Sequence, residues 1–160
     1  PKEPIPWIPA TQTMSIEDDG LTSEWSGKVW LNPPYGKHTA AWLKKMHQHR
    51  NGVALLFART DCAWFHDSVA KADAILFLRG RVKFVDGLGV TGGSGAGSGS
   101  MLVAWGAESV SALRSMSDLG HLVLSAQSTH HRHRLPSISC HYATRPHGHF
   151  LKDTHERPSN

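Results

Sequence analysis

Apolar and polar positions in the first half of the chain follow the order strand, helix, strand. The run "KVWLN" at 28–32 is short, apolar and stopped by Pro33, which donates no backbone hydrogen bond and disfavours helix in the residue before it. From His38 to about Gln48 the apolar residues recur at the spacing of an amphipathic helix. "VALLFA" at 53–58 is a continuous apolar run, typical of a parallel strand covered on both faces. This order predicts a βαβ unit.

The second half predicts further elements of both kinds. A helix at 62–71 is expected, followed by a buried strand, "AILFL", at 74–78. "RVKFV" at 81–85 alternates basic and apolar residues, as a half-exposed strand does. A Gly/Ser-rich loop at 87–100 precedes the strand "MLVAW" at 101–105, and a short helix at 108–116 closes the fold. The fold class we expect is therefore α/β, a sheet with flanking helices.

The chain has 160 residues, which is enough for one domain with its own core. We place that domain at 1–120. Residues 121–160 form a tail that is rich in His, Ser, Pro and Arg, for which we expect disorder. The tail contains eight of the chain's 12 histidines, but in irregular spacing with arginines between them, so we expect no metal site.

Charge and cysteine usage narrow the class of protein only slightly. Residues 1–120 have 12 Lys and Arg against 11 Asp and Glu, a net charge of +1, whereas the tail has five against two, a net of +3. Bulk charge is thus weak evidence for DNA binding. Cys62 and Cys140 have no CxxC partner, no apolar run has the length of a membrane span, and the N-terminus does not resemble a signal peptide. These features favour the cytoplasm.

The tetrapeptide Asn32-Pro33-Pro34-Tyr35 follows the first predicted strand directly. Ligands of parallel α/β sheets bind beyond the carboxyl ends of the strands, where Asn32 would lie. Its side-chain oxygen and the Pro33 carbonyl are two hydrogen-bond acceptors on a stiff frame, suited to the amino group of a conjugated ring. Tyr35 offers an aromatic face for stacking that ring. The alternative is that the segment only stops a strand and turns the chain.

Together with "EDDGL...W.GKVWLNPPYG", the later segments "VALLFARTDCAWFH" and "ADAILFLRGRVKF" make the chain similar to the Dam-type DNA N6-adenine methyltransferases of phages and prophages. The resemblance runs from about Glu17 to about Gly106, with the blocks in the expected order. It implies a class I S-adenosylmethionine-dependent methyltransferase fold (a Rossmann-like sheet, here partial), S-adenosylmethionine as cofactor, DNA as partner and a bacterial host cytoplasm. On this resemblance, Asn32, Pro33, Pro34 and Tyr35 are the catalytic residues.

The methyl-donor site is less complete. The family normally has a strand with an acidic, small-residue cofactor motif before the EDDGL block, and "PKEPIPWIPATQTMS" contains no such motif. We therefore expect a chain truncated at its N-terminus. Asp18 and Asp19 are the candidate cofactor contacts, with a solvated or capping turn as the alternative.

Other candidate residues follow the second and third predicted strands. Arg59 and Asp61 lie just after "VALLFA", on the edge expected to hold Asn32, and are candidate substrate contacts; Asp61 is also a natural helix N-cap. The basic side chains of the "RGR.KF" block suit phosphate contacts, although surface solubility explains them equally well. These are Arg79, Arg81 and Lys83.

The leading hypothesis is a site-specific DNA adenine-N6 methyltransferase. Three alternatives remain open: a non-catalytic remnant that binds DNA or a partner, an enzyme that methylates amino groups of RNA or protein, and a metal protein that uses the His-rich tail.

Overall fold

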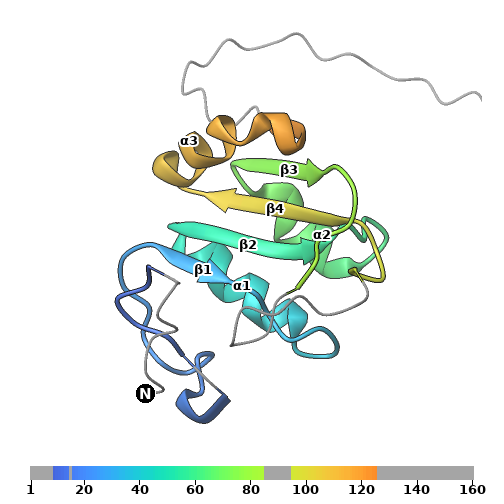
Figure 1. Cartoon of the computed structure of the whole chain (residues 1–160). Coiled ribbons are helices and arrows are strands. Elements are labelled where there is room, and N and C mark those ends of the chain that lie inside the picture. Colours follow the sequence, from blue (N-terminus) through green and yellow to red (C-terminus); the bar gives the residue numbers. More distant parts are fainter. Residues whose placement is uncertain (1–8, 15, 85–94, 126–160) are drawn as a thin grey trace, which may run out of the picture. The chain divides into compact units, whose positions relative to one another are not determined.

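A five-stranded sheet organises the residues that the computed structural model describes, which are 9–14, 16–84 and 95–125 (Figure 1). The strand order is β1-β2-β4-β3-β5. The strands are β1 (Val29–Leu31), β2 (Gly52–Phe57), β3 (Ala74–Leu78), β4 (Ser100–Trp105) and β5 (Gly120–Leu124). The helices are α1 (Thr39–His49), α2 (Ala63–Asp67) and α3 (Ala107–Ser115), with short 3-10 turns η1 (Ile16–Asp18), η2 (Val69–Lys71) and η3 (Ser117–Leu119).

The predicted βαβ unit is confirmed. β1 and β2 pair in parallel, with Val29 opposite Gly52 and Leu31 opposite Ala54, and α1 connects them. Gly52 is needed at the start of β2, because a Cβ there would lie 2.2 Å from the carbonyl oxygen of Val29. The close approach of the two backbones therefore sets where the parallel pairing begins.

The other strand pairs of the sheet are antiparallel, an arrangement that the sequence did not predict. β4 lies between β2 and β3 and is antiparallel to both, and β5 is antiparallel to β3. All six residues of β4 are buried, so this strand is central although it comes late in the chain. The architecture is thus α/β with flanking helices, as predicted, but only β1 and β2 pair in parallel.

Two apolar cores lie on the two faces of the sheet, because successive strand residues point to opposite sides. On one face α1, α2 and η2 cover a core that includes Leu43, Leu56 and Trp105. On the other face α3 covers a smaller core around Leu76 and Leu113 (Figure 1). The helices therefore cover the faces of the sheet, and the ends of its strands are left for a site.

Three local predictions need correction. The helix expected at 62–71 is interrupted at Ser68, whose backbone (φ −127°, ψ −50°) is not helical, so α2 ends and η2 begins there. Residues 81–84 form no strand. Residues 121–124 were assigned to the disordered tail, but they belong to β5, which pairs with β3.

Two sequence predictions concern segments that lie largely outside the described residues: the Gly/Ser-rich loop between 87 and 94, and the tail from 126 onward. In the described ranges, no helix is both long enough and apolar enough to cross a membrane.

Candidate active site at the carboxyl ends of the strands

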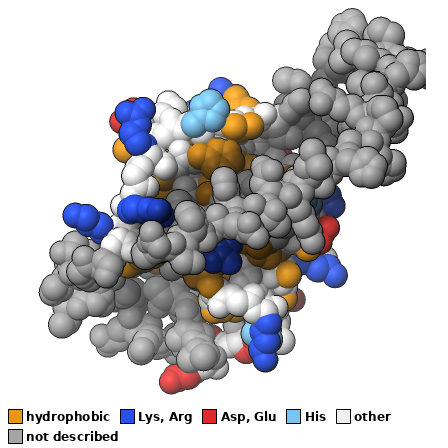
Figure 2. Space-filling view, turned by 90° about the vertical axis from the view of Figure 1, so that its right-hand side faces the viewer, with side chains coloured by type: hydrophobic (Ala, Val, Ile, Leu, Met, Phe, Trp, Pro, Cys, Tyr) orange, Lys and Arg blue, Asp and Glu red, His pale blue; other side chains and the backbone are white. Residues whose placement is uncertain are grey.

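The sequence-predicted catalytic and substrate residues follow three strands whose carboxyl ends lie on the same side of the sheet, which we call its carboxyl edge. β1 and β2 run in the same direction, and β3 shares that direction because β4, which separates it from β2, is antiparallel to both. Asn32 follows β1, Arg59 follows β2 and Arg79 follows β3. Figure 2 looks onto this side of the molecule and shows Lys and Arg side chains among and around hydrophobic ones. The structure thus brings the three groups to a common edge.

Asn32 is exposed immediately beyond β1, whereas Pro33 is buried. Within the described part of the chain, the Asn32 side chain makes no hydrogen bond. Its amide is therefore available to an incoming group, on a backbone that the next residue fixes.

Pro33 also explains how Tyr35 is held. Val29 N–H donates to the Asn51 carbonyl at 3.0 Å, and in a parallel ladder the donors advance two residues at a time on each strand. Residue 33 is therefore the donor expected at the Leu55 carbonyl, and proline has no N–H. The Tyr35 hydroxyl takes this place and donates to the Leu55 carbonyl in a long hydrogen bond of 3.4 Å. The strand stop thus leaves an acceptor that anchors the tyrosine.

The Tyr35 ring also packs on an aromatic neighbour. It stacks on Phe57, with 4.0 Å between the ring centroids and 16° between the planes. Burial raises the pKa of the Tyr35 hydroxyl above 10.0, and a hydrogen bond from the backbone of Phe57 opposes this only in part. The side chain nevertheless stays 40% exposed. Tyr35 is thus an uncharged aromatic side chain, and Phe57 covers one face of its ring.

Thr39 is a site residue that sequence reasoning missed. Its hydroxyl donates to the Pro34 carbonyl at 3.1 Å and accepts from Gly36 N–H at 3.0 Å. It is the first residue of α1 and is only 2% exposed. The signal in the sequence was a threonine three residues after Gly36, at the start of a helix that was already expected.

Arg59 and Asp61 both lie exposed beyond β2, the strand next to β1. The helix-cap alternative for Asp61 is wrong: the N-cap of α2 is Cys62, and no side chain caps it. Among the described residues, the Asp61 carboxylate accepts a weak hydrogen bond from the Cys62 thiol, at 3.9 Å. Both candidate substrate residues therefore face solvent at the edge where Asn32 lies.

The basic group after β3 lies farther along the edge. Three strand intervals separate the end of β3 from the end of β1, which corresponds to about 14 Å. Arg81 donates to the Ala96 carbonyl at 3.4 Å, and Ala96 N–H donates to the Val82 carbonyl at 2.9 Å. Arg81 is therefore held beside the segment that leads into β4, while Arg79 and Lys83 are exposed to solvent.

Asp18 and Asp19 lie in a turn ahead of β1. The Asp19 carboxylate accepts from the Thr22 hydroxyl at 3.0 Å, and the Asp18 carbonyl accepts from the Ser23 hydroxyl at 2.7 Å. The turn is fixed to α1, because the Lys45 ammonium donates to three of its carbonyls. These belong to Gly20 and Leu21, each at 2.9 Å, and to Ser23. Lys45 is thus committed to holding this segment in place.

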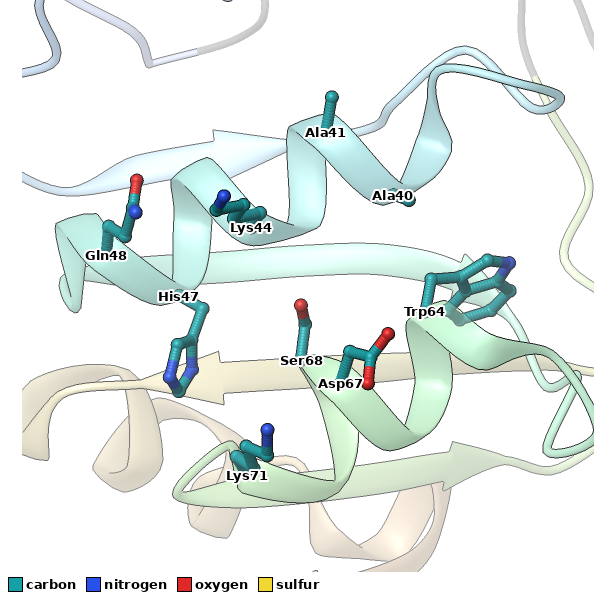
Figure 3. Close-up of a pocket in the computed structure, with 9 residues that line it drawn as sticks. All are labelled: Ala40, Ala41, Lys44, His47, Gln48, Trp64, Asp67, Ser68 and Lys71. Atoms are coloured by element: carbon teal, nitrogen blue, oxygen red, sulfur yellow. The ribbon is translucent and has the colours of Figure 1, made fainter.

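Asp18 and Asp19, the candidate contacts of S-adenosylmethionine, do not line the hollow that is found among the described residues. Asp19 is engaged within its own turn, and one hollow of about 520 Å³ in the described part of the chain lies between α1 and α2 (Figure 3). That hollow is lined by side chains such as Lys44, His47, Trp64, Asp67 and Lys71, and includes none of residues 32–35. Among the described residues, no group of three His, Cys, Asp or Glu side chains is placed to hold a metal ion.

The comparisons with known proteins bear on these observations. The DNA N-6-adenine-methyltransferase (Dam) family matches residues 10–128, which include every described strand and helix. No curated protein and no solved structure matches the chain. The family match includes the Asn32–Tyr35 segment, the edge beyond β2 and the basic residues after β3. The chain belongs to the DNA N-6-adenine-methyltransferase (Dam) family.

Proposed function

We propose that this chain is a site-specific methyltransferase that transfers a methyl group from S-adenosylmethionine to the N6 atom of adenine in DNA. The observation that carries the proposal is the exposed Asn32 at the carboxyl end of a parallel strand, next to a Tyr35 ring that two contacts hold in place. The family membership supports the same chemistry.

The amino group that receives the methyl needs hydrogen-bond acceptors for its N–H groups, and its ring needs an aromatic surface on which to stack. The lone pair of an exocyclic amine is delocalised into the ring, so acceptors on both N–H groups favour the more pyramidal and more nucleophilic nitrogen. Asn32 and the Pro33 carbonyl would supply these acceptors, with Pro34 holding the turn that follows. During transfer, N6 would form a bond to the methyl carbon as the sulfur–methyl bond of S-adenosylmethionine breaks to leave the neutral thioether S-adenosylhomocysteine, and the proton lost from N6 would pass to water. A preorganised frame favours this step because the charge develops next to fixed dipoles.

Tyr35 would stack the adenine once the base has left the duplex. Extruding a base costs a few kcal/mol, and stacking on an aromatic side chain returns about 1–3 kcal/mol. Because Phe57 covers one face of the Tyr35 ring, the base would use the other face. The adenine, the Tyr35 ring and the Phe57 ring would then form one stack.

DNA would lie along the edge at which the strands end. Arg59 and Asp61, which follow the strand next to β1, would contact the target nucleotide or its neighbour. Arg79, Arg81 and Lys83 would contact phosphates farther along, because contacts of this kind fix the register of the DNA without reading its sequence.

S-adenosylmethionine would supply the electrophilic methyl group, and Asp18 and Asp19 are the described residues that we propose contact it. The fold we propose is part of a class I, Rossmann-like methyltransferase sheet. The parallel β1–α1–β2 unit, with the site at the carboxyl ends of its strands, supports this assignment.

The test is methyl transfer from labelled S-adenosylmethionine to amplified DNA of mixed sequence, which carries no prior methylation. The product is identified as N6-methyladenine after digestion to nucleosides. Asn32→Ala should lower kcat by roughly 100-fold, the order found when one preorganised polar group of an active site is removed. Gln48→Ala is the matched control, because it removes an exposed amide on α1 away from the edge.

Both variants should unfold at the temperature of the wild-type chain, since each substituted side chain is exposed. Transfer that Asn32→Ala leaves unchanged would refute the role of Asn32. Saturable DNA binding without any transfer or S-adenosylmethionine binding would instead identify a non-catalytic remnant.

A further inference from the structure

The turn that contains Tyr35 is closed by one buried hydroxyl. Thr39 Oγ1 bonds the Pro34 carbonyl on one side of Tyr35 and the Gly36 N–H on the other. In addition, Thr39 N–H donates to the Gly36 carbonyl at 3.2 Å. The two residues that flank Tyr35 are therefore both fixed to the first residue of α1.

The side chain of Tyr35 is fixed separately, by β2. Its hydroxyl is bonded to the Leu55 carbonyl and its ring lies on Phe57. The backbone of the motif thus takes its position from α1, while the ring takes its position from the sheet. Both sets of contacts can form at the same time only when the start of α1 lies at a fixed distance from Leu55 and Phe57 of β2.

The hydroxyl has no close substitute at this position. Thr39 is 2% exposed, so water does not replace a lost hydrogen bond there without rearrangement. Gly36 has a φ of +132°, a conformation that side chains rarely adopt, so the turn depends on glycine at this point. His38, the N-cap of α1, makes no side-chain cap. The described contacts therefore assign the closing of this turn to Thr39.

We propose that Thr39 is a positioning residue for the methyl-transfer site, which holds the Asn32–Tyr35 segment so that the Tyr35 ring lies against Phe57 and presents its outer face to the acceptor base. The proposal rests on the proposed function for its catalytic consequence. Its structural part, the dependence of the Tyr35 position on the Thr39 hydroxyl, is independent of that function.

The first experiment compares Thr39→Val with Thr39→Ser in the methyl-transfer assay. Valine keeps the branched shape and removes both hydrogen bonds, whereas serine keeps the hydroxyl. Thr39→Val should lower kcat/KM by about tenfold, the equivalent of one lost hydrogen bond of the stronger kind. Thr39→Ser should retain most of the activity. Rates are expressed per folded molecule, using unfolding curves of the same samples.

The rate of the valine variant per folded molecule separates positioning from folding. If Thr39 only stabilises the fold, the valine variant loses activity in proportion to its unfolded fraction, and its kcat/KM per folded molecule equals that of the wild type. That result would overturn the proposal.

A second readout does not need activity. The chain has two tyrosines, Tyr35 and Tyr142, and Tyr35→Phe identifies which absorbance change on titration belongs to Tyr35. Burial raises the pKa of this hydroxyl in the wild type. Thr39→Val should move the pKa back toward 10.0, and Thr39→Ser should not. If the titration is identical in both variants and the wild type, Thr39 does not position Tyr35, whether or not the chain transfers methyl groups. If the titration responds as expected while the wild type is inactive, the proposed function fails and the positioning stands.

Discussion

The two ends of the sheet differ in how their side chains are used. At the end where β2 begins, Asp73 accepts Gly106 N–H at 2.7 Å and receives two hydrogen bonds from Arg50, at 2.7 and 2.9 Å. At the opposite end, Asn32 and Arg59 lie exposed. Charged groups at the first end connect segments of the chain, whereas at the second end they face solvent. Stability and chemistry should therefore respond to mutations at different ends.

Asp73→Ala should have the largest effect on stability. It removes the acceptor for Gly106 N–H and the partner of Arg50, and a hydrogen bond to a charged group contributes about 2 kcal/mol. Because Arg50 is partly exposed, solvent screens the ion pair and we add little for it. Urea unfolding should show the loss, with methyl transfer per folded molecule unchanged.

Lys28→Ala is the control at the same end. Lys28 pairs with Glu108 at 2.9 Å, but both side chains are exposed, so its loss should change the free energy of unfolding far less than Asp73→Ala does. Equal destabilisation of the two variants would show that the hydrogen-bonded Asp73 contributes no more to stability than the exposed Lys28–Glu108 ion pair.

Phe57→Leu should produce the opposite result at the other end. Leucine retains apolar volume but not the ring, and an aromatic pair contributes about 0.5–1.5 kcal/mol beyond its buried area. We expect methyl transfer to fall by up to about tenfold, through a less well-placed Tyr35, with little change in unfolding. Steady-state kinetics check this. Phe77→Leu in β3 controls for the loss of a ring that packs on the core.

Lowering the pH should first weaken the end of the sheet where β2 begins. His47 accepts a hydrogen bond from Nε1–H of the buried Trp105 at 3.3 Å. Desolvation, followed by the charges of Arg50 and Lys71, lowers the pKa of His47 below 6.5, against a smaller opposing effect of Asp73. The unfolded chain therefore takes up this proton before the folded chain does. The stability from His47 is complete above pH 6.5 and is lost as the pH falls through the lower folded pKa.

The measurement is the free energy of unfolding as a function of pH for the wild type and His47→Gln. The difference between them should shrink on acidification, and His66→Gln controls for removing an imidazole. A difference that is constant with pH would contradict the assignment. The pKa of Tyr35 is raised, so its hydroxyl stays protonated on acidification and should not contribute.

Local patterns were enough to predict β1, α1 and β2, because Pro33 and the apolar runs act within a few residues. They could not place β4 between β2 and β3, since its pairing depends on contacts far apart in the sequence. The edge position of Asn32 followed from the βαβ order. Thr39 did not follow from it, because a threonine at a helix start is common and its two partners appear only once the turn is folded.

The missing N–H of Pro33 makes the length of the motif as important as its composition. The end of β1 opposite Ala54 sets the position of Asn32, and the next carbonyl of β2, that of Leu55, sets the position of Tyr35. Contacts with β2 therefore fix the positions of both ends of the tetrapeptide. Inserting or deleting one residue between them would move the tyrosine off its acceptor even if all four original residues were kept, so homologous sequences can vary around this segment more easily than within its spacing.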